Sequence, residues 1–487
     1  MSNEIRALEP KQLWNKFADL NAVPRASKKE ERVIEFMKNF GNKLGLETLV
    51  DAVGNVIIKK PATPGMENRK KVVLQSHLDM VHQKNNNSNF DFENEGIKMY
   101  VDGDWVKAEG TTLGADNGLG VATIMAILES NEIPHPALEA LFTIDEETGM
   151  TGAMGLEPGM LEGEILLNLD TEEDDEIGIG CAGGVDITAI RNYKEEAVPE
   201  ESTAYKIVVK GLKGGHSGMD IIKGLGNANK LMNRFLFDGF EKFGLRIAEI
   251  NGGGLRNAIP RESVAVVTID TLQKEDFQKE FQKLLDLVKE EYKTLEPNLD
   301  VVISEVELPG KVMELGVQEL FVKAVYAAHN GVYRMSPEIE GLVETSNNVA
   351  RVELKNGKIE ILCLTRSSVE SSKMDLANSL RAGFELAGFE VTLSGEYPGW
   401  APNRNSAILK VLDEIYQDMN NEKAEIAACH AGLECGILGK NYPEMDMISF
   451  GPTIRGAHSP DERASISSAQ KYWKFVLRIL QDIPEKN

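Results

Sequence analysis

Apolar residues in the first third of the chain follow two different spacings. Residues 30–45 place apolar side chains every three or four positions and end at Gly45, which predicts an amphipathic helix. A second, mostly apolar helix is predicted over residues 117–129. Short continuous apolar runs, each typical of a strand buried on both faces, occupy residues 56–58, 72–75, 141–144 and 165–169. Buried strands separated by helices predict an α/β layered sheet.

The pattern changes after about residue 186. An acidic stretch that contains a proline, residues 195–201, is predicted to be a linker. The next predicted elements, alternating strands and then amphipathic helices, lie at 205–209, 263–270, 277–292 and 318–328. An Asn-Gly pair between the alternating segments 349–354 and 358–364 predicts a β-hairpin. We therefore expect an inserted α+β domain over residues 187–398.

The α/β pattern resumes after about residue 399. Strands and helices are predicted there at 406–419 (helix), 424–428 (strand), 445–450 (strand) and 467–481 (helix). These elements would complete the first sheet, so residues 1–186 and 399–487 are predicted to form one discontinuous domain.

Composition narrows the class of protein. The 487 residues carry a formal net charge of −24, which argues against nucleic acid as a partner because there is no basic excess to contact phosphates. No apolar run approaches the ~20 residues that span a membrane, and the first residues lack the apolar core of a secretion signal. The four cysteines form no C-x-x-C pair and do not indicate a disulfide framework. We expect a cytoplasmic protein with no membrane partner.

Acidic residues and histidines follow several of the predicted strands. His77 ends one strand, with Asp79 two residues further on; the acidic run 145–147 and Asp170 follow two others, and His458 lies in a late loop. Ligands bind beyond the carboxyl ends of strands in α/β sheets. Each signal alone has an ordinary alternative: a structural histidine for His77, and a solvated turn for residues 145–147.

Asp116 lies between glycines just before the apolar helix, where it could be a plain N-cap. Together, two histidines and three carboxylates form a set that suits zinc. Five ligands exceed the three of a mononuclear catalytic site. We therefore expect two ions that share one carboxylate, with a spare glutamate as the base for a water.

Longer motifs resemble a known family. The order of His77-x-Asp79, Gly114-Ala-Asp-Asn-Gly, Glu146-Glu147, Asp170 and His458 resembles the M20 metallopeptidases. Further strings resemble their aminoacyl-histidine dipeptidase (Xaa-His dipeptidase) branch; these begin at Ser76, Leu113, Gly211, Leu255 and His430. The similarity covers nearly the whole chain.

The resemblance implies a zinc-peptidase-type mixed sheet flanked by helices, with the inserted domain as a lid and dimer contact. It implies Asp116 as the bridge between two Zn²⁺ ions per subunit, which Co²⁺ or Mn²⁺ could replace. It also implies His77 and Asp170 as ligands of one ion, and Glu147 and His458 as ligands of the other ion. Glu146 would be the general base, and Asp79 would orient His77.

The resemblance also implies substrate contacts within the inserted domain. His216 would polarise the scissile carbonyl, with a flexible loop residue as the alternative. Asn257 and Arg366 are candidates for the substrate's terminal carboxylate, because an arginine fork binds two oxygens at once. His430 is a further candidate near the site, together with Glu434.

Three functions are compatible with these motifs to different degrees. The first is hydrolysis of dipeptides, including Xaa-His and β-alanyl-histidine, by a homodimer. The second is a related amidohydrolase acting on N-acyl amino acids or other short peptides. The third, a binding protein without catalysis, would predict loss of Glu146 or a ligand, and all are present.

Overall fold

The computed structural model describes residues 3–85 and 88–486, which form two compact units. Unit 1 comprises residues up to 180 with 402–428 and 433 onward. Unit 2 comprises residues 181–401 and 429–432. Among the described residues, no helix is both long and apolar enough to cross a membrane.

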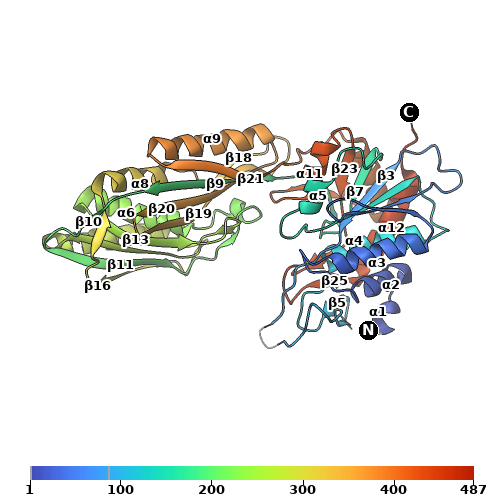
Figure 1. The fold of residues 1–487 in the computed structure, drawn as a ribbon, viewed down its shortest axis with the longest axis horizontal. Helices are drawn as coiled ribbons and strands as arrows, with labels where there is room; N and C mark the ends of the chain where they lie inside the picture. Colours follow the sequence, from blue (N-terminus) through green and yellow to red (C-terminus); the bar gives the residue numbers. More distant parts are fainter. Residues whose placement is uncertain (1–2, 86–87, 487) are drawn as a thin grey trace. The chain divides into compact units, whose positions relative to one another are not determined.

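Unit 1 contains a mixed sheet and its helices (Figure 1). Its strands are β1 (Glu47–Val50), β2 (Val56–Lys60), β3 (Val72–His77), β4 (Met99–Asp102), β5 (Trp105–Ala108), β6 (Leu138–Thr143), β7 (Ile165–Asn168), β8 (Glu176–Cys181), β22 (Glu425–Cys429), β23 (Asp446–Ser449), β24 (Ile454–Arg455) and β25 (Arg463–Ser465). Its helices are α1 (Asn3–Arg6), α2 (Lys11–Leu20), α3 (Glu31–Lys43), α4 (Ala115–Glu129), α5 (Thr151–Gly155), α10 (Ala407–Asn420), α11 (Glu434–Asn441) and α12 (Ile466–Asp482).

The strand order of the main sheet in unit 1 is β1-β2-β6-β3-β7-β23-β8-β22. The central strands β6, β3, β7 and β23 are parallel, so their carboxyl ends meet at one edge. These strands are buried along their lengths, as continuous apolar runs predict. A smaller sheet, ordered β24-β25-β5-β4, carries the loop of residues 456–462 between its first two strands.

Helix α4 is the central helix of unit 1. Its side chains from Asn117 to Leu128 are buried on every side, and it packs against both β3 and α2. A helix that is apolar all round belongs in a core. Its amino end therefore lies beside the carboxyl end of β3, which places Asp116 near His77.

Unit 2 contains an antiparallel sheet and helices (Figure 1). Its strands are β9 (Gly183–Asn192), β10 (Glu195–Ala197), β11 (Ser202–Lys210), β12 (Gly215–His216), β13 (Arg246–Gly253), β14 (Ala258–Ile259), β15 (Ser263–Asp270), β16 (Asp300–Val306), β17 (Lys311–Met313), β18 (Gly331–Met335), β19 (Val343–Lys355), β20 (Lys358–Ser367) and β21 (Glu390–Tyr397). Its helices are η1 (Ile221–Lys223), α6 (Ala228–Phe243), η2 (Thr271–Gln273), α7 (Lys274–Tyr292), α8 (Leu315–Ala327) and α9 (Glu370–Leu386).

The main sheet of unit 2 has the order β16-β11-β15-β13-β19-β20-β9-β21. Burial alternates along β11, where Tyr205, Ile207 and Val209 are buried and Lys206 is exposed. Helices α6, α7, α8 and α9 contribute to the same apolar core as the buried side chains of these strands. One face of this sheet is therefore covered by helices, as alternating strands predict.

Most predicted elements are present, and the predicted fold class is confirmed. The predicted hairpin is present: β19 and β20 are antiparallel, and Lys355 pairs with Lys358 across the turn. The prediction of a linker over residues 195–201 is wrong for Glu195–Ala197, which form β10 and pair with β17.

The limits of the units differ slightly from the predicted domain limits of 186 and 399. Strand β9 begins at Gly183, and Cys181 pairs with Trp400, so unit 2 starts earlier and ends later. Residues 429–432 also belong to unit 2, which the sequence pattern did not indicate.

Candidate metal centre

The acidic and histidine residues predicted from sequence gather at the carboxyl ends of β3, β6 and β7. His77 is the last residue of β3, Asp170 follows β7, and the run from Asp145 follows β6. These three strands are adjacent and parallel, so their ends lie side by side. Sheet topology thus brings together residues that are far apart in sequence.

Asp116 points its two carboxylate oxygens in different directions. Its Oδ1 lies 3.2 Å from Nε2 of His77, and its Oδ2 lies 3.1 Å from Nε2 of His458. Asp116 lies at a kink of α4 with a ψ of 111°, and because both of its oxygens face histidines, a plain N-cap does not describe its side chain. The two oxygens of one carboxylate therefore face two different histidines. The Asp116–Asn117 peptide bond is cis.

Two groups of side chains that could hold a metal ion share Asp116. His77, Asp116 and Asp170 form one group, and Asp116, Glu147 and His458 form the other, with the ligand atoms of each within 4.8 Å of one another. His77, Glu146 and Glu147 form a further such group. Asp170 Oδ1 lies 3.5 Å from His77 Nε2, and Glu147 Oε2 lies 2.9 Å from His458 Nε2.

Asp79 contacts both His77 and the acidic turn of residues 145–147. Its Oδ1 lies 3.3 Å from Nδ1 of His77, so the other ring nitrogen of His77 faces the ligand groups. The same carboxylate accepts hydrogen bonds from the backbone N–H groups of Glu146 and Glu147, at 3.0 and 3.3 Å, and from the hydroxyl of Ser27 at 2.7 Å. Asp79 therefore holds both His77 and the acidic turn in place.

The acidic turn of residues 145–147 is largely shielded from solvent. Asp145 is buried and accepts hydrogen bonds from Thr148 and Thr151. The Glu147 side chain is 4% exposed, and its Oε1 has no hydrogen-bond partner among the described residues. Burial raises the pKa of Glu146 well above its usual range, and repulsion from Asp170 and Glu434 adds to this.

Both histidines of the centre are surrounded by negative charge. Hydrogen bonds to Asp116 and Glu147 raise the pKa of His458 to about 11. Burial alone would lower the pKa of His77, but the carboxylates of Asp170 and Asp116 raise it well above its usual range. The cluster thus stabilises positive charge at two positions, which is what divalent cations would supply.

The residues present fit two divalent ions. The donor set combines imidazole nitrogens with carboxylate oxygens, as zinc prefers. The buried, unpartnered Oε1 of Glu147 is an acceptor that a cation would satisfy. Asp116 faces both groups and is the residue that could bridge two ions.

Unit 2 contains a second polar cluster, formed by His216, Arg366 and His430. The Nδ1 atom of His216 accepts hydrogen bonds from the backbone N–H groups of Gly218 and Met219, at 3.2 and 3.1 Å. The ring proton of neutral His216 therefore lies on Nε2, which makes that atom a donor. A Cβ on Gly218 would lie 2.1 Å from the carbonyl oxygen of His430, so only glycine allows this close approach.

Arg366 is buried within this cluster. Its Nη1 donates to the Tyr397 hydroxyl at 2.6 Å, and its Nε donates to Ser217 at 3.4 Å. Among the described residues, no hydrogen bond reaches its Nη2. The guanidinium thus keeps capacity for an anionic ligand.

Asn257 and His430 occupy different settings in unit 2. The carbonyl oxygen of Asn257 accepts from the N–H of Ser217 at 2.8 Å, and its exposed side chain bonds no described residue. His430 is buried, with Nε2 placed 2.7 Å from Ser346 Oγ. Burial, together with the positive charge of Arg366, lowers the pKa of His430 to about 3, so it is neutral near pH 7.

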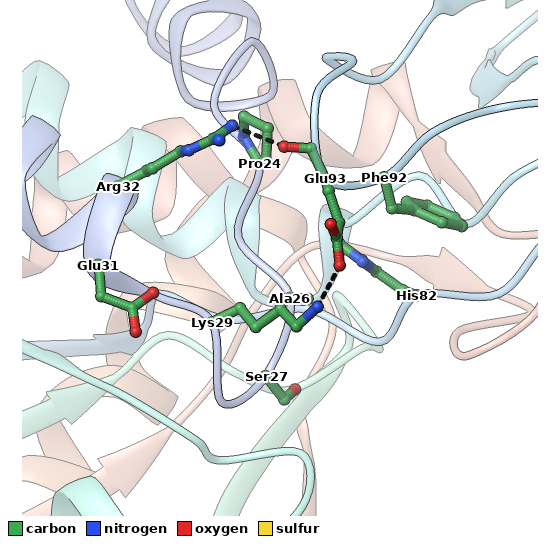
Figure 2. Close-up of a pocket in the computed structure, with 9 residues that line it drawn as sticks. All are labelled: Pro24, Ala26, Ser27, Lys29, Glu31, Arg32, His82, Phe92 and Glu93. Carbon is green, nitrogen blue, oxygen red and sulfur yellow. Dashed lines mark hydrogen bonds and ion pairs between the residues drawn. The ribbon is translucent and has the colours of Figure 1, made fainter.

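Unit 1 also contains a separate pocket of about 380 Å³ (Figure 2). Lys29 forms an ion pair with Glu93, and Arg32 donates to the Glu93 carbonyl oxygen at 2.6 Å. The rings of His82 and Phe92 stack with centroids 4.1 Å apart. Its basic side chains are thus already paired, and the carboxylate–histidine cluster remains the candidate centre.

Sequence reasoning missed several residues beside the centre. Glu462 accepts hydrogen bonds from the loop that carries Asp116, and the fully buried Arg25 donates to the carbonyl oxygens of Leu78, Asp79 and Gly114. Burial and repulsion from Asp116 raise the pKa of Glu172 to about 8. The position of Glu462, four residues after His458, places it in the same loop, but no motif marks it as a partner of the segment that carries Asp116.

Glu434 is fully buried in unit 1, where it contacts side chains of β3 and β6. Its Oε2 accepts hydrogen bonds from Gln75 and Thr143, both at 2.6 Å. Burial raises its pKa to about 8. Glu434 belongs to none of the described groups that could hold a metal ion, but its charge acts on His77 and Asp170.

Several known proteins are similar to this chain over nearly its whole length. The chain is 44% identical to the cytosol non-specific dipeptidase of Escherichia coli, over 99% of this chain and 100% of that protein. The structure of an aminoacylhistidine dipeptidase from Vibrio alginolyticus matches with a TM-score of 0.92 and 45% identity, covering 99% of each chain. Aminopeptidase PepT from Bacillus cereus shares the fold, with a TM-score of 0.58 and 15% identity over 98% of this chain and 99% of that chain. Residues 73–482 match the model of peptidase family M20/M25/M40. The chain therefore belongs to peptidase family M20/M25/M40, as its motifs predicted.

Proposed function

We propose that this protein is a dipeptidase that uses two zinc ions to hydrolyse short peptides, including Xaa-His dipeptides. The observation that carries this proposal is the geometry of Asp116, whose two oxygens lie 3.2 and 3.1 Å from different histidines. A shared carboxylate between two ligand groups is typical of two-metal hydrolytic sites. Asp116, with His77 and Asp170, would hold one ion.

The second ion would be held by Asp116 with Glu147 and His458. Two divalent ions acidify a water between them and polarise a scissile carbonyl. Co²⁺ or Mn²⁺ could replace zinc, because the donor set of imidazole and carboxylate groups also suits these ions.

Glu146 is the proposed general base. It lies next to the ligand Glu147 but belongs to neither of the ligand groups that share Asp116. It would accept the proton of the attacking water and return it to the leaving amine. Asp79 holds the Glu146 N–H at 3.0 Å and so fixes the base relative to His77.

Unit 2 would bind the rest of the substrate. Arg366 has an unused Nη2 and would bind the terminal carboxylate, with Asn257 beside it. The Nε2–H of His216 would donate to the carbonyl oxygen as negative charge develops there. We assign to unit 2 the roles of lid and dimer contact, and His430 would support the same pocket.

The substrate class rests on the relatives. The names of the Escherichia coli and Vibrio alginolyticus proteins describe a non-specific dipeptidase and an aminoacylhistidine dipeptidase. We infer the same class here, with β-alanyl-histidine among the substrates, and a cytoplasmic location. Hydrolysis of N-acyl amino acids is the second candidate, because the same ligand set could cleave that amide.

The proposal can be tested with purified protein, a panel of Xaa-His, Xaa-Gly and N-acetyl amino acid substrates, and a chelator. We expect hydrolysis of the dipeptides, complete loss after chelation and recovery after addition of Zn²⁺ or Co²⁺. Activity that survives thorough removal of metal would refute metal catalysis. Cleavage of N-acetyl amino acids in preference to dipeptides would favour the second candidate instead.

A further inference from the structure

Glu462 makes an unusual set of hydrogen bonds at the start of helix α4. Its Oε2 accepts from the N–H groups of Leu113 and Gly114 at 2.7 and 2.9 Å. Its Oε1 accepts from the N–H groups of Ala115 and Asp116 at 2.8 and 3.3 Å. The side chain is buried, and its residue is 3% exposed. A single carboxylate thus satisfies consecutive donors at a helix amino end, where a negative charge is favourable.

These hydrogen bonds connect two loops that both carry proposed ligands. One loop holds Asp116, and the other, between β24 and β25, holds His458 four residues before Glu462. The remaining hydrogen bonds of described residues 456–461, apart from those of His458, are turn bonds within that loop and one from the Arg463 side chain to the carbonyl oxygen of Asp461 at 3.5 Å. Glu462 is therefore the buried attachment of the His458 loop to the Asp116 loop.

The His458 loop depends on such an attachment. The His458 side chain is 54% exposed, and its φ of +64° is a left-handed conformation that non-glycine residues rarely adopt. Without a fixed anchor, such a loop would relax to a more favourable backbone conformation.

The first ligand group has other supports. The side chain of Asn117 donates to the carbonyl oxygen of Leu169 at 2.7 Å and to the carboxylate of Asp170. Arg25 donates to the carbonyl oxygen of Gly114 and to those of Leu78 and Asp79. Asp116, His77 and Asp170 thus remain linked to one another even if Glu462 is changed.

We propose that Glu462 is a positioning residue that sets the distance between Asp116 and His458, and thereby the affinity of the second metal position. The inference rests on the proposed two-metal function. Residues that orient metal ligands typically change metal affinity by about 10- to 100-fold when they are substituted. The effect should therefore fall on the ion held by Asp116, Glu147 and His458.

The test uses Glu462→Gln, which keeps the size of the side chain. Either orientation of the amide turns an NH₂ group toward two backbone N–H donors. The shorter Glu462→Asp, which keeps the charge, serves as a second variant if the first does not fold. The matched control is Glu139→Gln, because Glu139 is also buried and accepts the N–H groups of Glu162 and Gly163 at 2.8 and 2.9 Å.

Metal-free proteins would be titrated with Zn²⁺ in competition with a chromophoric chelator. We expect two ions to bind wild type and Glu139→Gln with the same affinities. The Glu462 variants should bind the first ion as wild type does and the second about 10- to 100-fold more weakly. Excess Zn²⁺ should restore most of their turnover, which a general loss of structure would not allow.

Two outcomes separate failure of this inference from failure of the proposed function. If wild type binds two ions and Glu462→Gln binds both with unchanged affinity, the positioning role is refuted. If wild type binds fewer than two ions, the proposed two-metal function fails instead.

Discussion

His458 in unit 1 and His430 in unit 2 lie in opposite electrostatic surroundings. In unit 1, Asp116 and Glu147 raise the pKa of His458 to about 11. In unit 2, burial and the positive charge of Arg366 lower the pKa of His430 to about 3. Without metal, the imidazole of His458 thus favours its protonated form, whereas that of His430 favours its neutral form.

This difference indicates what each cluster can bind. In the carboxylate–histidine cluster of unit 1, the carboxylates outnumber the positive groups. The Oε1 atom of Glu147 has no hydrogen-bond partner among the described residues and remains an acceptor for a cation. The cluster of unit 2 contains a buried guanidinium whose Nη2 has no partner among the described residues, which suits an anion. A dipeptide presents both an amide for metal-assisted hydrolysis and a carboxylate for an arginine.

Among the proposed substitutions, Glu146→Gln in unit 1 should lower turnover the most. Loss of a general base typically costs about 10²- to 10⁴-fold in rate, and turnover should fall by at least this factor. Metal content should stay at the wild-type value, because Glu146 belongs to neither ligand group that shares Asp116. Steady-state kinetics on a dipeptide and metal analysis by mass spectrometry measure the two quantities.

Wild-type turnover of Glu146→Gln with metal bound would exclude Glu146 as the general base. Loss of metal in proportion to activity would instead show that Glu146 is a metal ligand. The metal measurement tests this second outcome, because His77, Glu146 and Glu147 also form a group that could hold a metal ion.

A smaller effect is expected from Arg366→Ala in unit 2. Hydrogen bonds to charged groups contribute about 1.5–3 kcal/mol, so KM for a dipeptide should rise about 10- to 100-fold. Turnover at saturation should change less, because the carboxylate lies outside the reacting amide. A dipeptide with an amidated C-terminus is the control substrate, since it offers Arg366 no carboxylate.

The ratio of wild-type to Arg366→Ala activity should approach one with the amidated control. An equally large ratio with both substrates would mean that Arg366 supports the pocket without binding the carboxylate. Its hydrogen bond to Tyr397 at 2.6 Å is the contact through which such support would act.

The sequence predicted the fold where burial follows a regular period. The continuous apolar runs of β3, β6 and β7 and the alternation in β11 indicated the two kinds of sheet. The linker prediction at Glu195–Ala197 was wrong because an acidic, exposed edge strand has the composition of a loop. The assignment of residues 429–432 to unit 2 depends on long-range contacts that carry no local signal.

For the candidate centre, local sequence indicated residues that end strands, such as His77 and Asp170. It could not indicate Arg25, which lies in a short segment without a motif and acts through backbone carbonyl oxygens. Glu462 likewise contacts backbone N–H groups of a loop far away in the chain, and such contacts leave no residue pattern at either end.

The proposed function requires that two divalent ions share Asp116. Crystals of the zinc-loaded protein, measured with anomalous scattering at the zinc edge, test it directly. We predict two peaks about 3.5–4 Å apart, one on each side of the Asp116 carboxylate. A single peak at full zinc occupancy, or two peaks that Asp116 does not separate, would show that Asp116 is not shared by two ions.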